Sequence, residues 1–397
     1  MVGLVGGEPI IVVHPAISRI GIDLELRQEA GMGRVRLAAT IMGERIGGRP
    51  FAGLFLALVG AAQVCLQMDA EIGNLFKVRL GGFAIVAGAE QEAATPMTDT
   101  PLNQYEMRDP RTQYPKPPFP KQPQEKPGFV EQMEPRADHG EESYKGFGRL
   151  KGRKALITGG DSGIGRAVAI AYAREGASVT ISHLPVEQED AQSLVDLMQD
   201  EGHTIHTIPG DLTDADFCGD LIARAAAQMG GLDILVNNAG KQVRQPGIAD
   251  VSHEQFDETM KTNVYAMFWL TKAALPLMPP GATIINVTSN QGFSPAPYLL
   301  DYATSKFAIR GFTEALAQGA IEQGVRVNAV APGPFWTPLQ PSGGQTQEKV
   351  QEFGKATPMG RPGQPAELAP TFVFLASQES SYVCGEVIGV TGGKPIS

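Results

Sequence analysis

The stretch KALITGGDSGIG, residues 154–165, decides the fold of this chain. A short, largely apolar strand runs into glycines with the spacing G-x3-G-x-G, and a helix is predicted to follow over Gly163–Glu175. Gly159 permits a tight turn, Gly163 lets the backbone approach a phosphate, and Gly165 allows the helix to pack closely on the strand. The free N–H groups at the start of that helix can hold a pyrophosphate. The stretch therefore predicts a dinucleotide-binding turn.

Downstream of this turn, apolar strands alternate with helical segments. The strands are predicted at Lys154–Thr158, Ser178–His183, Thr204–Ile208, Leu232–Val236, Thr283–Val287, Val325–Val330 and Val387–Val390. Alternating strands and helices with largely apolar strands indicate a parallel sheet that is covered on both faces. Together with the glycine turn, this pattern predicts an α/β, doubly wound Rossmann fold with a mostly parallel seven-stranded sheet.

The composition of the chain argues against several classes of binding protein. The chain has 397 residues, 42% of them hydrophobic, and a net charge of −10. An acidic chain of this kind argues against nucleic acid and anionic membranes as partners. Cys65, Cys218 and Cys384 form neither a metal spacing nor a disulfide framework, so we expect a cytoplasmic protein without a metal site.

Three parts are expected: residues 1–96, residues 97–148, and an NAD(P)-binding domain over 149–397. The first part has seven Arg but one Lys, and no clear helix or strand period. We expect it to lie outside the working protein, with translation starting at Met97. The alternative is a membrane or targeting role for Phe51–Met68, although this run is short of the roughly 20 apolar residues that span a bilayer.

Residues 97–148 are predicted to form an extended arm. Their nine prolines are Pro101, Pro110, Pro115, Pro117, Pro118, Pro120, Pro123, Pro127 and Pro135. Proline removes backbone donors and fixes φ, which disfavours helix and central strand. A free linker would not need large apolar anchors, which here are Tyr105, Tyr114, Phe119, Phe129, Met133 and Tyr144. We therefore favour an arm that lies across its own or a neighbouring subunit over a loose linker.

A Ser, a Tyr and a Lys follow the dinucleotide turn. Tyr302 and Lys306 are four residues apart, so they share one helix face, where an ammonium can favour the ionised phenol. Such a phenol can act as general acid or base for a carbonyl and its alcohol. Ser289 ends the fifth strand, and Asn263 lies inside the helix after the fourth, where an Asn is unfavourable unless its side chain bonds nearby.

The second strand bears on the choice of cofactor. An acid about 20 residues after the turn would bind the 2′-hydroxyl of NAD. The strand ends at His183, and no carboxylate appears before Glu187, which favours NADP(H) over NAD(H). His183 and Arg166 are the candidates for a 2′-phosphate. Asp211 and Leu212 follow the third strand at the expected place of the adenine; a helix N-cap is the other interpretation of Asp211.

These motifs resemble the short-chain dehydrogenase/reductase (SDR) family over about residues 150–397. Its glycine turn matches Thr158–Gly165, its Asn-Asn-Ala-Gly matches Asn237–Gly240, and its Pro-Gly turn matches Pro332-Gly333. Its catalytic residues match Asn263, Ser289, Tyr302 and Lys306. The Pro-rich arm is similar to a bacterial branch that includes aldehyde reductases, glucose dehydrogenase-like enzymes and general stress proteins.

The resemblance implies a mechanism, a cofactor site and an assembly. A hydride passes between the nicotinamide and a carbonyl carbon while Tyr302 transfers the proton, Ser289 binds the oxygen, Lys306 binds the ribose and Asn263 holds a relay water. It also implies a homotetramer built on the helices after the fourth and fifth strands. The expected cofactor contacts are Thr158, Gly159, Ser162, Gly163, Ile164, Gly165, Arg166, His183, Asp211, Leu212, Asn238, Ala239, Gly240, Tyr302, Lys306, Pro332, Gly333 and Thr337.

The substrate side is expected around the loop after Gly333. Residues 339–346 are predicted to form a mobile lid. The expected substrate contacts are Ser289, Gln291, Phe293, Phe335 and Trp336. Aromatic and amide groups with little charge indicate a small neutral carbonyl or hydroxyl compound. The other interpretation of Phe335 and Trp336 is that they pack the loop down.

Two other functions fit the sequence less well. A 3-oxoacyl-carrier-protein reductase would need a basic patch for its acidic partner. Arg244, Lys349, Lys355 and Arg361 are scattered along the sequence instead. A dinucleotide-sensing protein without catalysis is the third hypothesis, which the intact Ser, Tyr and Lys argue against.

Overall fold

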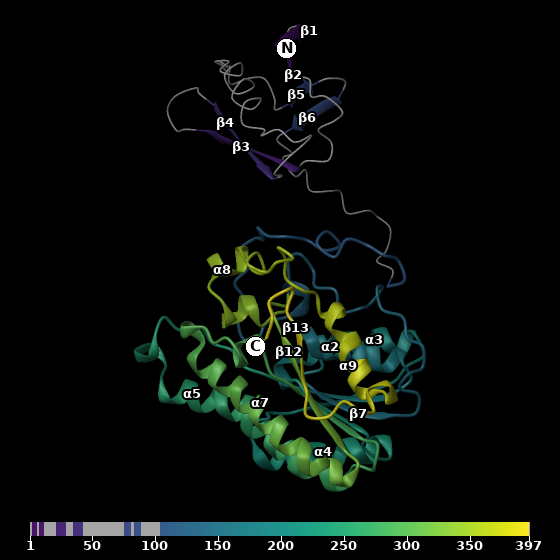
Figure 1. Cartoon of the computed structure of the whole chain (residues 1–397). Coiled ribbons are helices and arrows are strands. Elements are labelled where there is room, and N and C mark those ends of the chain that lie inside the picture. The colour runs from purple at the N-terminus through teal and green to yellow at the C-terminus, as the bar shows by residue number, and fades with distance from the viewer. Residues whose placement is uncertain are drawn as a thin grey trace. The chain divides into compact units, whose positions relative to one another are not determined.

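The computed structural model describes residues 104–396 and, before them, only the backbone of six short strands (Figure 1). Those strands pair antiparallel as β1–β2, β3–β4 and β5–β6. Their bounds are Val2–Val5, Glu8–Ile11, Gly21–Gln28, Val35–Met42, Leu75–Leu80 and Phe83–Gly88. The chain divides into two units, Met1–Pro96 and Met97–Ser397. The stretch Phe51–Met68 and the expected start at Met97 lie outside the described residues.

The second unit contains a seven-stranded sheet in the order β13-β12-β11-β10-β7-β8-β9. All neighbouring strands in it are parallel. The bounds are β7 Lys154–Thr158, β8 Ser178–His183, β9 Ile205–Pro209, β10 Ile234–Asn237, β11 Thr283–Val287, β12 Arg326–Pro332 and β13 Val387–Val390. From β7, successive strands are added first on one side of the sheet and then, from β10, on the other side. At such a reversal a crevice forms outside the carboxyl ends of the two neighbouring strands, here β7 and β10. The predicted doubly wound Rossmann fold is confirmed.

Helices cover both faces of this sheet (Figure 1). They are α2 Gly163–Arg174, α3 Gln188–Asp200, α4 Ala215–Met229, α5 His253–Met260, α6 Ala266–Ala274, α7 Leu300–Ala320, α8 Gln347–Gln351 and α9 Pro365–Ala376. Side chains alternate across the sheet, so Ile157 of β7 packs in the core beneath α2, α3 and α9, while its neighbour Leu156 packs with α4, α6 and α7. The described part of the chain has no helix long and apolar enough to cross a membrane.

Residues 104–148 lie against this domain. Tyr114, Phe119, Met133 and Tyr144 are buried, as expected of anchors. Tyr105 is 57% exposed and meets Phe147 edge-on, with ring centroids 5.7 Å apart. These buried side chains favour an arm over a loose linker, and which subunit the arm covers stays a prediction.

Candidate active site

The glycine turn between β7 and α2 has the shape that a phosphate cradle needs. Gly159 and Gly163 have φ values of +60° and +50°, which L side chains rarely adopt. A Cβ on Gly165 would lie 1.9 Å from the carbonyl oxygen of Gly159, so any larger residue would push α2 off the strand. These three positions fit the pyrophosphate of a dinucleotide at the start of α2.

Hydrogen bonds join the residues that follow β10 to this turn. The hydroxyl of Thr158 accepts hydrogen bonds from the backbone N–H groups of Asn238 and Ala239, at 3.0 and 3.1 Å. The amide of Asn238 donates to the carbonyl oxygens of Thr158 and Gly159, both at 2.9 Å. Asn238 and Ala239 are therefore fixed beside the glycine turn and form the floor of the expected cofactor crevice.

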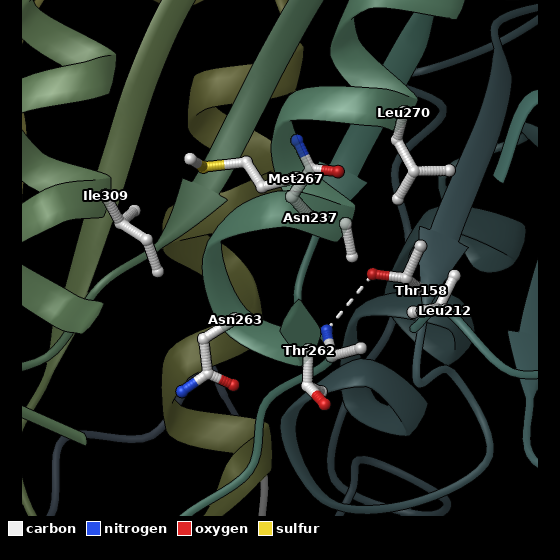
Figure 2. A pocket seen from close by; sticks show the side chains of 10 residues that line it. Thr158, Leu212, Asn237, Thr262, Asn263, Met267, Leu270 and Ile309 are labelled. Carbon is white, nitrogen blue, oxygen red and sulfur yellow. Dashed lines mark hydrogen bonds between the residues drawn. The ribbon is translucent and has the colours of Figure 1, made fainter. Parts of the chain in front are cut away.

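A small cavity lies beside this floor (Figure 2). Its volume is about 10 Å³, close to the least that holds one water molecule. Its lining residues are Thr158, Leu212, Asn237, Ala239, Thr262, Asn263, Ala266, Met267, Leu270 and Ile309. Ser289, Tyr302 and Lys306 do not line it, so this cavity is not the substrate site.

Ser289, Tyr302 and Lys306 meet at the carboxyl edge of the sheet. All three are buried, and the Nζ of Lys306 lies 5.3 Å from the centroid of the Tyr302 ring. Lys306 donates to the carbonyl oxygen of Val287, at 2.8 Å. Burial raises the pKa of the Tyr302 phenol to about 12, although a hydrogen bond with Ser289 opposes that rise. The predicted trio is thus one cluster that spans the end of β11 and the first turns of α7.

The phenol does not show the lowered pKa that a neighbouring ammonium was expected to give it; that effect of the lysine stays a prediction. Burial also lowers the pKa of Lys306 to about 7, because its ammonium is removed from water. With a pKa of about 7, the Lys306 side chain is only partly charged near pH 7, which weakens its effect on the phenol. Tyr302 therefore keeps its proton throughout the neutral range.

Asn263 lies in an irregular helical turn. Lys261–Tyr265 forms a single π-helical turn between α5 and α6, a type of irregularity that is frequent at functional sites. The Asn263 side chain accepts from the N–H of Lys241 at 2.7 Å and donates to the carbonyl of Lys241 at 2.9 Å. It also donates to the hydroxyl of Ser305, at 2.9 Å. These bonds explain an Asn inside a helix and join the loop after β10 to α7.

Arg166, a candidate for the 2′-phosphate, is bonded to protein groups in this structure. Its guanidinium is buried and donates to the carbonyl oxygens of Asp161 and Asp190, at 3.3 and 3.0 Å. Its Nε lies 3.5 Å from the carboxylate of Glu141 in the arm. The side chain therefore links α2 and α3 to the arm and to the glycine turn, and its bonds to these protein groups do not favour contact with a 2′-phosphate.

Three titratable residues lie at or just after the ends of β7 and β8: His183, which was predicted to contact the cofactor, and Asp161 and Glu187, which the sequence analysis did not select. His183 is buried; its Nδ1 lies 2.8 Å from the carbonyl oxygen of Leu184, and its Nε2 has no hydrogen-bond partner among the described residues. Burial raises the pKa of Asp161 to about 6. Burial and the neighbouring Asp161 raise the pKa of Glu187 to about 8, although Glu187 accepts a hydrogen bond from the N–H of Leu184.

Asp211 and Leu212 follow β9 near this edge. Asp214, and not Asp211, caps α4, since its carboxylate accepts from the N–H groups of Asp216 and Phe217. Asp211 accepts from the N–H of Thr213, at 2.9 Å, in a local turn. The helix-cap interpretation of Asp211 is therefore excluded, while the side chain of Leu212 packs in the core beneath α4.

Phe335 and Trp336, which were expected to contact substrate, are packed against protein groups in this structure. Trp336 is fully buried against the arm, and Phe335 packs in the sheet core beside Gly363. The second interpretation of these two rings, that they pack the loop down, is the one the structure supports. On the opposite side, Gln291 accepts from the N–H of Ala296 and Phe293 stacks on the guanidinium of Arg310.

No metal centre is present among residues 104–396, where no three His, Cys, Asp or Glu side chains are placed to share an ion.

The protein family and the relatives that this chain resembles are reductases, oxidoreductases or dehydrogenases by their descriptions. The family described as “Enoyl-(Acyl carrier protein) reductase” matches residues 159–394. The chain is 57% identical over 288 residues to “Uncharacterized oxidoreductase YghA” of Escherichia coli (strain K12), which covers 72% of this chain and 98% of the relative. It is 41% identical over 285 residues to “Glucose and ribitol dehydrogenase” of Daucus carota, which covers 70% of this chain and 98% of that protein.

Two solved structures are also similar to this chain. A short chain dehydrogenase from Burkholderia cenocepacia J2315 in complex with NADP is 31% identical, with a TM-score of 0.58 over 62% of this chain and 98% of that one. A blue fluorescent protein from a metagenomic library in complex with NADPH is 30% identical, with a TM-score of 0.58 and the same two coverages. With its glycine turn, strand order and Ser-Tyr-Lys cluster, the chain belongs to the short-chain dehydrogenase/reductase family of oxidoreductases.

Proposed function

We propose that this protein is an NAD(P)(H)-dependent oxidoreductase that interconverts a carbonyl compound and an alcohol, with Tyr302 as the general acid and base. The observation that carries the proposal is the convergence of Ser289, Tyr302 and Lys306 beside a turn shaped for a dinucleotide. The carboxyl edge of a doubly wound sheet is where ligands bind. A small neutral aldehyde, ketone or sugar is the proposed substrate, in a cytoplasmic protein.

The protein residues handle the substrate oxygen and its proton. When bound, the dinucleotide supplies or accepts the hydride at the substrate carbon. In reduction, Tyr302 donates its proton to the carbonyl oxygen, and the raised pKa suits this role because the phenol starts protonated. The hydroxyl of Ser289 donates a hydrogen bond to the same oxygen and stabilises the charge that develops there.

The proton that Tyr302 gives up is replaced through its neighbours. Lys306 lies close enough to position the phenol and, as the family resemblance implies, the ribose hydroxyls. Asn263, beside the cavity that has room for one water, completes the proposed relay toward solvent. Thr337 and the Pro332-Gly333 turn complete the nicotinamide side of the site.

NADP(H) is the proposed preference over NAD(H). Two solved relatives hold NADP or NADPH. Because Arg166 is bonded to protein groups, the argument within this chain rests on the unpartnered Nε2 of His183. The pKa of Glu187 is about 8, so its carboxyl is largely uncharged at pH 7 and repels a 2′-phosphate little.

The acyl-carrier alternative finds little support in the charges near the loop. Arg361 is buried and paired with Glu367, at 2.7 Å, and Lys355 is paired with Glu352. Arg244 stacks on the ring of Tyr298, 3.6 Å from its centroid. These cations do not form the basic patch that an acidic carrier protein would need.

A cofactor-by-substrate panel tests the proposal. NADPH and NADH are assayed against aldehydes, ketones and acetoacetyl thioesters, and NADP⁺ and NAD⁺ against alcohols and glucose. We expect turnover of simple carbonyls, and Tyr302→Phe should lower kcat at least about 100-fold. Near-normal turnover by Tyr302→Phe would exclude the proposed role, and tight NADPH binding without any turnover would favour a dinucleotide sensor.

A further inference from the structure

The indole of Trp336 is held by the arm. Its ring centroid lies 4.3 Å from that of Phe119 and 6.2 Å from that of Phe353, with Met133, Ala137 and Val350 in the same apolar cluster. Its Nε1–H donates to the carbonyl oxygen of Pro135, at 2.8 Å. Trp336 is fully buried, so the arm completes a pocket that would otherwise leave the indole in water.

The arm also bonds to the loop that was expected to be a mobile lid, residues 339–346, and to α8, which follows it. The hydroxyl of Ser342 donates to the carbonyl of Pro127, at 2.8 Å. The N–H of Phe119 donates to the carbonyl of Gln351 at 2.9 Å, and that of Gln122 donates to the side chain of Gln347 at 2.8 Å. Several bonds along one edge hold the loop better than one bond could, because each removes freedom from the same segment.

The other edge of the loop is held by the segment after β10. The buried amide of Gln242 donates to the carbonyl of Gly344, at 2.7 Å. The N–H of Arg244 donates to the carbonyl of Gly343, at 3.3 Å. Residues 339–346 therefore lie between two fixed segments and form a preformed wall.

Trp336 adjoins a residue of the cofactor site. The next residue, Thr337, is buried, and its methyl group lies over the glycine turn: a Cβ on Gly163 would come within 3.1 Å of it. A continuous line of contacts thus runs from Phe119 through Trp336 to Thr337 and the start of α2.

We propose that the arm is a positioning element for the nicotinamide half of the dinucleotide: by clamping Trp336, it holds Thr337 and the loop in the geometry that binds the ring. This inference rests on the proposed use of a nicotinamide dinucleotide. The arm touches neither the substrate nor the cofactor in this scheme, so Phe119 and Trp336 are positioning residues. A wall already in place spares the ligand the entropy of ordering it.

The test compares two ligands that differ only in the nicotinamide. Calorimetry measures the Kd of NADPH and of 2′-phospho-ADP-ribose, which lacks the nicotinamide ring, for the full chain and for Phe119→Leu and Trp336→Phe. We expect the Kd of NADPH to rise at least about fivefold in both variants, the lower end of typical coupling between sites. The Kd of 2′-phospho-ADP-ribose should stay within a factor of about two, since the adenosine half is held elsewhere.

Tyr144→Phe is the matched control. Tyr144 is a buried aromatic residue of the same arm, but its hydroxyl donates to Glu175, away from the loop. Loss of this hydroxyl should change the midpoint of thermal unfolding. It should not change the Kd of NADPH relative to that of 2′-phospho-ADP-ribose. Equal weakening of both ligands in Phe119→Leu and Trp336→Phe, or no weakening, would overturn the inference. If the wild-type protein binds NADPH but turns over no substrate, the proposed reaction is contradicted. The ratio of the two Kd values would still test whether the arm positions the nicotinamide half.

Discussion

Lys306 is a basic side chain that is buried with few partners. An ammonium has three donors, and here the carbonyl oxygen of Val287 is the acceptor that its Nζ reaches. Its pKa falls from 10.5 to about 7 because burial disfavours the charged form. The side chain therefore loses a proton on folding over a wide range of pH, and stability must depend on pH through it.

Lys306→Met should show this dependence. Between pH 7 and 10.5 the unfolded lysine binds a proton that the folded one does not, so wild-type stability rises with pH across that window. The variant lacks this slope, and its stability relative to wild type should be highest at or below pH 7 and decline toward pH 10. Thermal unfolding at a series of pH values measures the difference, and Lys349→Met on the exposed surface of α8 is the control. A difference that stays constant with pH would contradict the lowered pKa.

Glu187 should make the cofactor preference depend on pH. Its pKa is raised to about 8, so the carboxyl is mostly protonated at pH 7 and ionised at pH 9. Only the ionised form repels a 2′-phosphate, and the ratio of the NADPH Kd to the NADH Kd should therefore rise from pH 7 to 9. Glu187→Gln keeps an acceptor for the N–H of Leu184 and should flatten the ratio. The exposed Glu189→Gln is the control, and equal slopes in both variants would count against this role.

At the scale of elements, one carboxylate joins the arm to α2. Glu175 follows the last turn of α2, and its buried side chain accepts from the N–H groups of Phe147 and Arg149, at 2.8 and 2.9 Å. It also accepts from the Tyr144 hydroxyl and the Arg149 guanidinium, each at 2.6 Å. Burial alone would raise its pKa, but these bonds lower it to about 2.

Glu175→Gln should loosen this junction. The amide cannot match the charge of Arg149, and hydrogen bonds to charged groups contribute about 1.5–3 kcal/mol each. We expect a loss of roughly 2 kcal/mol in the free energy of unfolding, measured in urea at pH 7. The pKa of wild-type Glu175 is depressed, so its contribution should disappear as the pH falls from 4.5 toward 2. Glu201→Gln, which removes an exposed pair with Arg174, should change stability by less than about 1 kcal/mol.

The elements themselves were predictable because their patterns are local. The predicted ends of all seven sheet strands lie within two residues of the observed ones, since apolar periods and glycine spacing set them. Arg166 and Trp336 were assigned to the ligand because the sequence places them beside a cofactor motif. Pro135, which accepts from Trp336, and Glu141, which pairs with Arg166, belong to the arm, which has no period to reveal them. The burial of Asp161 and Glu187 likewise depends on neighbours that the sequence does not specify.

At the scale of the whole molecule, α5, α6 and α7 carry exposed aromatic residues. Tyr265, Phe268 and Phe307 are each more than 40% exposed, and Phe256 is 37% exposed. Apolar rings on adjoining helices are typical of an interface between subunits. This observation favours the proposed homotetramer, built on the helices after the fourth and fifth strands.

Substitution on this face should dissociate the assembly. We expect the wild-type chain to have the mass of a tetramer by size exclusion with light scattering, and Phe268→Glu or Phe307→Glu to shift it to smaller species. A charge placed in an apolar interface has no partner and opposes association. Met107→Glu, at a fully exposed position of the arm, should leave the mass unchanged. A monomeric wild-type chain would exclude the proposed assembly.

The contacts of the arm also bear on how the chain is made. The arm is synthesised early, yet Pro135 bonds to Trp336, Pro110 to Arg361 and Gln113 to Glu367, between 201 and 254 residues later. Loops of that length close slowly, and a nascent chain emerges from the ribosome in order. The arm therefore cannot dock completely until the chain has been translated past Glu367. As a consequence, the nicotinamide half of the site is among the last parts of the protein to form.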